Sequence, residues 1–456
     1  MPTISKNQQT YQNFTKVGWA ERLEINITES TQGYTLKKPI VLEVPEPKDT
    51  KEEKVYEYIL ETFTGKSPDL AKFTFENKSA FHIAEHLLLH RTGSKATLYN
   101  YIYDIHDFTE SLGTTPDQIL NGCLDSNGSV KPIALARTIK SLESFAGSLK
   151  AERKLAPTTI FNMVDYIQLF FRLNGLPLKL PYPLRKWSLY EDRAPTQEEL
   201  QKMLSLADLR EKVIVCALAT GGFRVGTLAK LQYRHVKRDI EHNIIPIHVH
   251  VEGEITKTKY HGYDTFLNFE TSEYLITYLT ARRNIAYKQR SETFPPENIT
   301  DQSPLISYGD RKTLLTADQI SYVVHNLLLK AGIISSYSGF LNLSSLHRRR
   351  YDVRPHSIRK FFRSQLALLG VDRDIIEYMM GHKTDKYHDV KMKGIEFLRS
   401  TYAKSGLTIR PQTKADKILA LRAIARSWGL TPEEICEAKL PHSTEFSSFR
   451  LSLAGD

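Results

Sequence analysis

The amino-acid sequence predicts a mainly α-helical protein with a small antiparallel β-sheet, divided into a helical domain and a mixed second domain. Apolar residues recur at three- and four-residue spacing in four stretches between residues 66 and 180, and again after residue 196. In the segment IPIHVHVE, by contrast, Ile247, Val249 and Val251 alternate with polar neighbours, as a half-buried strand requires. The prolines of residues 181–195 interrupt the helical pattern and indicate a linker between the two domains.

The first half of the chain holds two predicted segments. Residues 1–65 are polar and mixed in charge, and we assign them to an N-terminal arm or subdomain of unknown role. Residues 66–180 carry four amphipathic stretches: AFHIAEHLLLH, TLYNYIYDIHDFTESLG, PIALARTIKSLESFAGSL and TTIFNMVDYIQLFFRLNG. Polar breaks such as RTGSK and LDSNGS separate these stretches, so we expect four short helices that form a compact domain.

The second domain is expected over residues 196–410, and it begins where TQEEL offers a helix cap with acidic residues in the first turn. A β region is expected at 244–268, and the apolar spacing predicts helices at 197–208, 210–220, 316–331, 355–369, 373–380 and 394–404. Residues 411–456 are expected to form a C-terminal helical tail. Its amphipathic stretch 415–429 is a candidate for contacts between subunits.

The composition favours an intracellular protein with a polyanionic partner. The chain has 62 Lys and Arg against 52 Asp and Glu, which leaves a formal charge of +10. No apolar stretch is long enough to span a bilayer, and the first residues lack a secretory signal, so we expect a cytoplasmic protein without membrane association. The three cysteines lie far apart in the chain, which indicates neither a zinc ribbon nor a disulfide framework.

The second domain carries, in a particular order, the residue types that break a phosphodiester without a metal. Such chemistry needs cationic donors on the non-bridging oxygens, an in-line nucleophile and a proton donor for the leaving oxygen. Arg224 follows a glycine pair, and Lys257 and Lys259 share one face of the expected strand EITKTKY. His356 and Arg359 lie three residues apart at a helix start, and a short apolar helix ends at Gly381 and His382.

This order of Arg, hairpin Lys, His-x-x-Arg, Gly-His and Tyr resembles the tyrosine recombinase (phage-type integrase) family, including its archaeal and viral members, over residues 70–405. The helical domain, with GSKATLYNYIYDIHDF, resembles the core-binding domain of that family. The resemblance implies a DNA strand transferase that cleaves and rejoins double-stranded DNA through a 3′-phosphotyrosyl intermediate. It implies no cofactor, metal or small-molecule substrate, a homotetramer on two duplexes, and association with the nucleoid when bound to DNA.

The resemblance also implies roles for individual residues. Arg224 and Arg359 would grip the non-bridging oxygens, because a guanidinium fork matches phosphate geometry. Lys257 would protonate the departing 5′ oxygen, with Lys259 as the alternative on the same face. His356 and His382 would position the phosphate and assist proton transfer.

The nucleophile departs from the family pattern, because the position where the family tyrosine is expected, 391, is a lysine. Tyr387 lies five residues after His382 in the polar stretch KTDKYHD, and we prefer it because this setting leaves its hydroxyl free. Tyr402 remains an alternative, although it forms a packing row with Ile395 and Leu398. A second departure is Thr227, three residues after Arg224, where the family often has an acid.

Further residues are candidates for contacts with the DNA backbone. The run that leads into the His-x-x-Arg helix is strongly basic, and it holds Arg348, Arg349, Arg350, Arg354, Lys360 and Arg363. In the helical domain the candidates are Ser94, Lys95 and Thr97, although helix capping explains Ser94 and Thr97 equally well. His248 and His250 share a strand face without further metal ligands, so we interpret them as a solvent-facing pair rather than a zinc site.

Two other functions compete with the recombinase interpretation. Type IB topoisomerases use a similar set of Arg, Lys, His and Tyr residues but relax DNA as monomers. A catalytically inactive DNA-binding protein of the same fold is the second alternative, and the displaced tyrosine is the feature that favours it.

Overall fold

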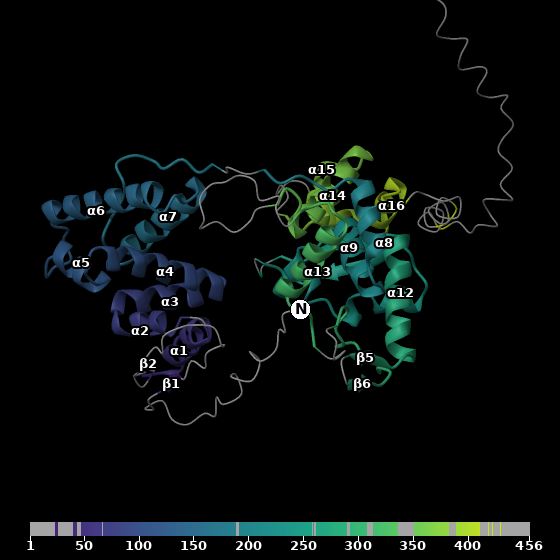
Figure 1. Cartoon of the computed structure of the whole chain (residues 1–456), viewed down its shortest axis with the longest axis horizontal. Helices are drawn as coiled ribbons and strands as arrows, with labels where there is room; N and C mark the ends of the chain where they lie inside the picture. The colour runs from purple at the N-terminus through teal and green to yellow at the C-terminus, as the bar shows by residue number, and fades with distance from the viewer. Residues whose placement is uncertain are drawn as a thin grey trace, which may run out of the picture. The chain divides into compact units, whose positions relative to one another are not determined.

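The computed structural model describes most of the chain, and its contacts divide it into two compact units (Figure 1). The described residues up to 187 belong to unit 1, and those from 191 onwards to unit 2. Among the described helices, none is long and apolar enough to cross a membrane. The described residues are 23–25, 40–42, 47–65, 67–187, 191–257, 259, 261–289, 292–307, 313–335, 351–382, 389–410, 418, 422 and 429.

The described part of unit 1 is helical apart from one short antiparallel strand pair, and four of its helices begin with proline, which has no N–H to leave unpaired at a helix start. A core of Phe108, Phe145 and Phe171 lies where α4, α6 and α7 meet. The elements are β1 (Leu23–Ile25), β2 (Ile40–Leu42), α1 (Thr50–Phe63), α2 (Pro68–Glu76), α3 (Lys78–His90), α4 (Lys95–Ser111), α5 (Pro116–Cys123), α6 (Pro132–Ala151) and α7 (Pro157–Leu173).

The four helices that the sequence predicts in this unit are confirmed as α3, α4, α6 and α7. Three further helices, α1, α2 and α5, were not predicted. Helix α1 lies inside the segment expected as an arm, yet its Ile59 and Phe63 are fully buried in the core of unit 1. The domain boundaries at 65, 180, 195 and 410 remain predictions.

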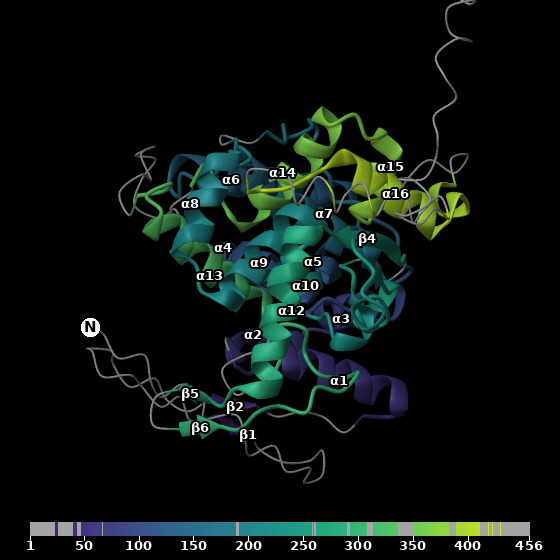
Figure 2. The same cartoon turned by 90° about the vertical axis from the view of Figure 1, so that its right-hand side faces the viewer.

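Unit 2 is built around α9, in which every residue from Val213 to Gly221 is buried. A helix that is apolar on all sides has to be covered on all sides, and α12, α13 and α14 pack around it (Figures 1 and 2). The elements are α8 (Gln197–Leu206), α9 (Leu209–Gly221), α10 (Val225–Leu228), η1 (Tyr233–His235), α11 (Lys237–Glu241), β3 (Ile247–Val251), η2 (Gly253–Ile255), β4 (Tyr263–Leu267), α12 (Phe269–Asn284), β5 (Tyr287–Gln289), β6 (Glu292–Phe294), α13 (Ala317–Lys330), α14 (Pro355–Leu368), α15 (Arg373–Met379), η3 (Val390–Lys393) and α16 (Ile395–Ser405).

All six helices predicted in this unit are confirmed, as α8, α9, α13, α14, α15 and α16. The predicted β region contains the antiparallel pair β3–β4, in which Ile247 lies opposite Leu267 and Val251 opposite Tyr263. Helix α12 was not predicted. The amphipathic stretch 415–429 lies almost entirely outside the described residues.

One strand prediction was wrong. The segment EITKTKY does not continue the strand, because β3 ends at Val251 and a short 3-10 turn, η2, follows. The Thr256 hydroxyl closes this turn by donating to the Gly253 carbonyl at 2.6 Å, and Lys259 has a left-handed φ of 61°. Lys257 therefore lies in the loop of the β3–β4 hairpin, and the argument from a shared strand face does not apply to it and Lys259.

Asp104 is a buried carboxylate in the middle of α4. Its residue is 7% exposed, between helices whose other buried residues are mainly apolar. Burial, followed by the negative charge of Asp107, raises the pKa of Asp104 to about 7. The folded state thus holds a proton that the unfolded chain loses near the ordinary aspartate pKa.

Replacing Asp104 by asparagine should stabilise the protein at high pH only. Because the folded-state pKa is raised, stability falls as pH rises from about 4 through about 7, and the asparagine variant escapes this loss. The gain at pH 8 has an upper limit of about 4 kcal/mol, since one pKa unit corresponds to about 1.4 kcal/mol. Thermal unfolding at about pH 4.5 and about pH 8 measures it, with the exposed Asp165→Asn as control. An equal gain at both pH values would contradict the prediction.

Candidate active site

The end of α9 approaches α14 so closely that only glycine fits there. Gly222 ends α9 with a left-handed φ of 65°. A Cβ added to it would lie 2.6 Å from the ring of Phe362 on α14. The glycine pair before Arg224 therefore brings the carbonyl end of α9 against α14, and Arg224 follows at the N-cap of α10.

The end of α15 has a similar requirement. Gly381 has a left-handed φ of 63°, and a Cβ added to it would collide with the ring of Tyr263 on β4. The turn is closed by the Gly381 N–H, which donates to the Tyr378 carbonyl at 2.8 Å, and by the His382 N–H, which donates to the Glu377 carbonyl at 2.9 Å. The chain thereby turns back over α15, and His382 lies beside that helix.

Arg359 and Arg224 converge on this turn from two directions. Arg359, on α14, is 2% exposed and donates to the Gly222 carbonyl at 2.6 Å, to the Met380 carbonyl, and to Nε2 of His382 at 3.0 Å. Arg224 is placed 3.4 Å from the Met380 carbonyl and 3.5 Å from the Gly381 carbonyl. The structure therefore brings together three of the residues that the sequence singled out, Arg224, Arg359 and His382.

The positive charge of this cluster has little compensation. Burial, followed by the charge of Arg224, lowers the pKa of Arg359 to about 10. In the described part of the chain, no carboxylate is hydrogen-bonded to either guanidinium. Two guanidinium groups held by neutral carbonyls form a preorganised site for an anion such as a phosphodiester.

The tautomer of His382 follows from its hydrogen bonds. Its Nδ1 lies within hydrogen-bond distance of Oε2 of Glu377, and an ionised carboxylate can only accept. Nδ1 therefore carries a proton, and Nε2 accepts from Arg359. The Nε2 end of the imidazole therefore faces Arg359.

His356 lies on the exposed first turn of α14, one helical turn before Arg359. Partial desolvation and then the positive charge of Arg359 lower its pKa, which favours the neutral imidazole. Lys257 is exposed in the hairpin loop, and the described residues show no contact between it and the arginine pair. Lys259 is also exposed, so the choice between the two lysines stays open.

The two candidate nucleophiles differ in position. Tyr402 is 2% exposed, and its hydroxyl donates to the Thr220 carbonyl of α9 at 2.7 Å. Its ring packs 5.7 Å from that of Phe266, and burial raises its pKa far above the ordinary value. Tyr402 therefore belongs to the core in this arrangement. Tyr387 lies outside the described residues.

Three of the cations predicted to contact DNA are paired with carboxylates inside the protein. Asp192 accepts from Arg354 at 3.0 Å and from Lys360 at 2.8 Å, and these partners outweigh burial and hold its pKa well below the usual range. Arg363 donates to Glu377 at 2.7 Å. Arg348, Arg349 and Arg350 lie outside the described residues.

In unit 1, Ser94 is the N-cap of α4. Its hydroxyl accepts from the Thr97 N–H at 3.4 Å, at the start of α4. Lys95 forms an ion pair with Glu61 at 2.9 Å. None of these contacts tests whether the three residues also bind DNA.

The prediction for His248 and His250 was incomplete. His250 is exposed, but both imidazoles lie 2.8 Å from the same carboxylate oxygen of Asp264. The other oxygen of Asp264 accepts from Tyr378 at 2.5 Å, so Asp264 links the β3–β4 hairpin to α15. Among the described residues, no group of His, Cys, Asp or Glu has an arrangement suited to a metal ion.

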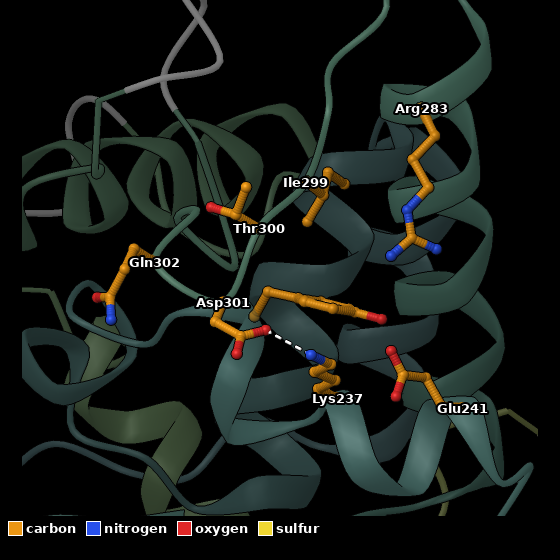
Figure 3. A pocket seen from close by; sticks show the side chains of 8 residues that line it. Lys237, Glu241, Arg283, Ile299, Thr300, Asp301 and Gln302 are labelled. Carbon is orange, nitrogen blue, oxygen red and sulfur yellow. Dashed lines mark hydrogen bonds and ion pairs between the residues drawn. The ribbon is translucent and has the colours of Figure 1, made fainter.

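A polar hollow lies elsewhere in unit 2, between the end of α12, α11 and the segment 299–302 (Figure 3). Lys237 and Asp301 form an ion pair of 2.8 Å across it, and the guanidinium of Arg283 lies 5.1 Å from the ring centroid of Tyr233. Lys237 and Arg283 are balanced by Glu241 and Asp301, so the hollow has no evident preference for an anion.

Sequence reasoning missed Glu377 and Asp192. Glu377 lies five residues before His382, which is not a helical neighbour spacing, and becomes its partner only through the left-handed turn at Gly381. Asp192 lies in the expected linker, more than 150 residues from Arg354 in the chain. The local sequence EDR, with acids next to an arginine in the linker, is a weak signal for the ion pairs of Asp192.

Comparison with known proteins finds several relatives of this chain. Residues 194–390 match the phage integrase family. The tyrosine recombinase XerA of Thermococcus kodakarensis is 24% identical over 260 residues, which cover 54% of this chain and 74% of that protein. A crystal structure of XerA recombinase is 19% identical and covers 77% of this chain and 98% of its own, with a TM-score of 0.30. A lambda integrase dimer bound to a COC′ core site is 16% identical and covers 68% of this chain and 92% of its own, with a TM-score of 0.41.

Glycines with a positive φ differ in the space around their Cβ position, and this difference gives a prediction about stability. Gly381→Ala should cost about 1–3 kcal/mol, because the alanine combines a strained left-handed backbone with a collision against Tyr263. Gly370→Ala is the matched control, since Gly370 also has a positive φ, 79°, but open space around its Cβ position. Denaturant unfolding of both variants measures the difference. Equal losses would show that the approach of Tyr263 does not require glycine at 381.

Proposed function

The chain belongs to the phage integrase family of tyrosine-type DNA breaking and rejoining enzymes, and we propose that it recombines specific sites in double-stranded DNA through a 3′-phosphotyrosyl intermediate. The observation that carries the proposal is the convergence of Arg224, Arg359 and His382 on the turn after α15. All three lie within the residues that match the family. Two guanidiniums beside one imidazole can hold a phosphate and move a proton at the same place.

The two arginines act on the scissile phosphate. Each offers N–H groups that neutral carbonyls occupy in the absence of DNA, and a charged phosphate oxygen is the stronger acceptor. Because no carboxylate is hydrogen-bonded to them in the described structure, their charge is available to the pentacoordinate transition state. His356 approaches the same phosphate from the helix start, and Lys257 protonates the departing 5′ oxygen from the hairpin loop.

Tyr387 is the nucleophile in this proposal. It lies within the residues that match the family, whereas Tyr402 lies beyond them. Tyr402 is also buried with its hydroxyl bonded to Thr220, so it could attack a phosphate only after leaving the core. Tyr387 follows His382 by five residues, and this length of chain spans at most about 18 Å.

DNA would lie along the exposed side of α14, where Arg354, Lys360 and Arg363 contact backbone phosphates. The basic residues 348–350 would extend this contact, and Ser94, Lys95 and Thr97 would supply another from unit 1. Joining two duplexes requires four active sites, so we propose a homotetramer on DNA, with the segment 415–429 contributing to contacts between subunits. No metal or nucleotide takes part in the proposed reaction.

A nicked suicide duplex that carries the attachment site tests the chemistry and names the nucleophile. The cleaved end diffuses away from such a substrate, so the covalent adduct accumulates and is seen on a denaturing gel. We expect an adduct in EDTA with the wild type and with Tyr402→Phe, and none with Tyr387→Phe. Loss of the adduct in Tyr402→Phe alone would reverse the assignment.

Two other outcomes distinguish the alternatives. If dilute protein relaxes arbitrary supercoiled plasmids, the chain acts as a type IB-like topoisomerase. If no variant forms an adduct on DNA that the wild type demonstrably binds, the chain is a catalytically inactive DNA-binding protein of this fold.

Removing the carboxylate of Asp192 should strengthen binding to non-specific DNA. Asp192→Asn removes the anion that Arg354 and Lys360 share, so affinity at low salt should rise several-fold and fall more steeply as salt is added. Fluorescence anisotropy with a labelled duplex measures both effects. The control is Asp318→Asn, which removes an exposed charge on α13 and changes the net charge equally. Weaker binding than this control would mean that Asp192 positions the two cations for DNA.

A further inference from the structure

Glu377, on α15, holds His382 by both its backbone and its side chain. The Glu377 carbonyl accepts from the His382 N–H at 2.9 Å, and its carboxylate accepts from Nδ1 of the imidazole. The other carboxylate oxygen accepts from Nε of Arg363 at 2.7 Å. The side chain is 18% exposed, so these contacts are partly shielded from water.

This carboxylate has no counterpart among the other acids of the described structure. It is the one acidic side chain there that is hydrogen-bonded to a member of the Arg224, Arg359 and His382 cluster. The position three residues after Arg224 holds Thr227, which is buried and uncharged. The carboxylate that compensates the cluster is therefore Glu377 of α15, and it acts through its hydrogen bond with His382.

The surroundings of Glu377 favour its ionised form. Burial alone would raise its pKa, but the hydrogen bonds with His382 and Arg363 outweigh burial and hold the pKa below its ordinary value. A fixed anion on Nδ1 favours the tautomer with a free Nε2, and it stabilises the imidazolium once Nε2 has taken a proton.

We infer that Glu377 is a positioning residue for strand cleavage, which holds His382 with Nδ1 protonated and Nε2 facing the phosphate site. The inference rests on the proposed function. In the step it serves, the tyrosine hydroxyl loses its proton to Nε2 while its oxygen forms a bond to phosphorus. The bond from phosphorus to the 5′ oxygen breaks, and that oxygen takes a proton from the hairpin lysine.

In the proposed reaction the phosphate binds at Arg359, beside Nε2 of His382. The N–H that now donates to Nε2 of His382 is 3.0 Å away, and it is free to turn to a phosphate oxygen when DNA binds. Nε2 then loses the donor that it has among the described residues and becomes able to accept a proton. Arg363 fixes the second carboxylate oxygen of Glu377, which keeps the carboxylate from rotating away during this exchange.

Single-turnover cleavage of the suicide duplex tests the inference in the full-length protein. Glu377→Ala and Glu377→Gln should each lower the cleavage rate on the order of 10²-fold, and the amide is not a substitute because it can donate to Nδ1 and reverse the tautomer. The Kd for the duplex should not increase, because Glu377 does not contact DNA in the proposal and its removal only releases Arg363 toward the backbone. Glu377→Asp should recover part of the rate. Glu273→Gln is the control, since it also replaces a carboxylate that forms an ion pair with an arginine, Arg410, by an amide.

The tautomer of His382 gives a second readout that needs no catalysis. ¹⁵N spectra of labelled protein without DNA, with the signal assigned by its loss in His382→Gln, should show Nδ1 protonated in the wild type. In Glu377→Gln that preference should be lost. Wild-type cleavage and an unchanged tautomer in Glu377→Gln would overturn the inference and leave the recombinase function intact. Absence of any wild-type adduct would overturn the function instead, while the spectra would still report on Glu377.

Discussion

The geometry of unit 2 depends on how the guanidinium of Arg359 is buried. A buried cation normally needs a carboxylate, because desolvation is otherwise too costly. Here the acceptors are the carbonyls of Gly222 and Met380, at the ends of α9 and α15. The carbonyl end of a helix carries partial negative charge, so two helix ends replace the missing anion. Because the acceptors are neutral, Arg359 keeps the net positive charge that attracts a phosphate.

The same requirement explains the packing around the site. Two helices can end at one guanidinium only if their last turns approach other elements closely, and glycine at 222 and 381 permits that approach to Phe362 and to Tyr263. Helix α9 has to be apolar on every side because it runs through the middle of the unit to reach this point. The buried Tyr402 belongs to this support, since its hydroxyl donates to the carbonyl of Thr220, the residue before the last one of α9.

The elements that sequence reasoning found are those with local signals. Helices α8 and α13 begin with capping boxes, Thr196 with Glu199 and Thr316 with Gln319, and both were predicted close to their observed ends. The row of Leu398 and Tyr402 was interpreted as packing, and both residues are buried. Helix α12 was missed because its buried face is largely polar, with Glu270, Thr271 and Ser272 at its start. Contacts that depend on tertiary structure, such as those of Glu377 and Asp192, left almost no trace in the sequence.

The ion pairs of the basic residues imply that these residues contribute unequally to the free energy of binding DNA. Arg354, Lys360 and Arg363 already have carboxylate partners, so a phosphate that binds them has to displace an ion pair and gains little beyond the exchange. In the described structure no carboxylate is hydrogen-bonded to Arg224 or Arg359, so a phosphate gains a charge-assisted bond without displacing an anion. The formal charge of +10 therefore overstates the attraction along α14 and understates it at the arginine pair. In the proposed function, this distribution would hold one phosphate firmly and its neighbours loosely, which suits an enzyme that has to find one bond in a long uniform polyanion and release the strand after exchange.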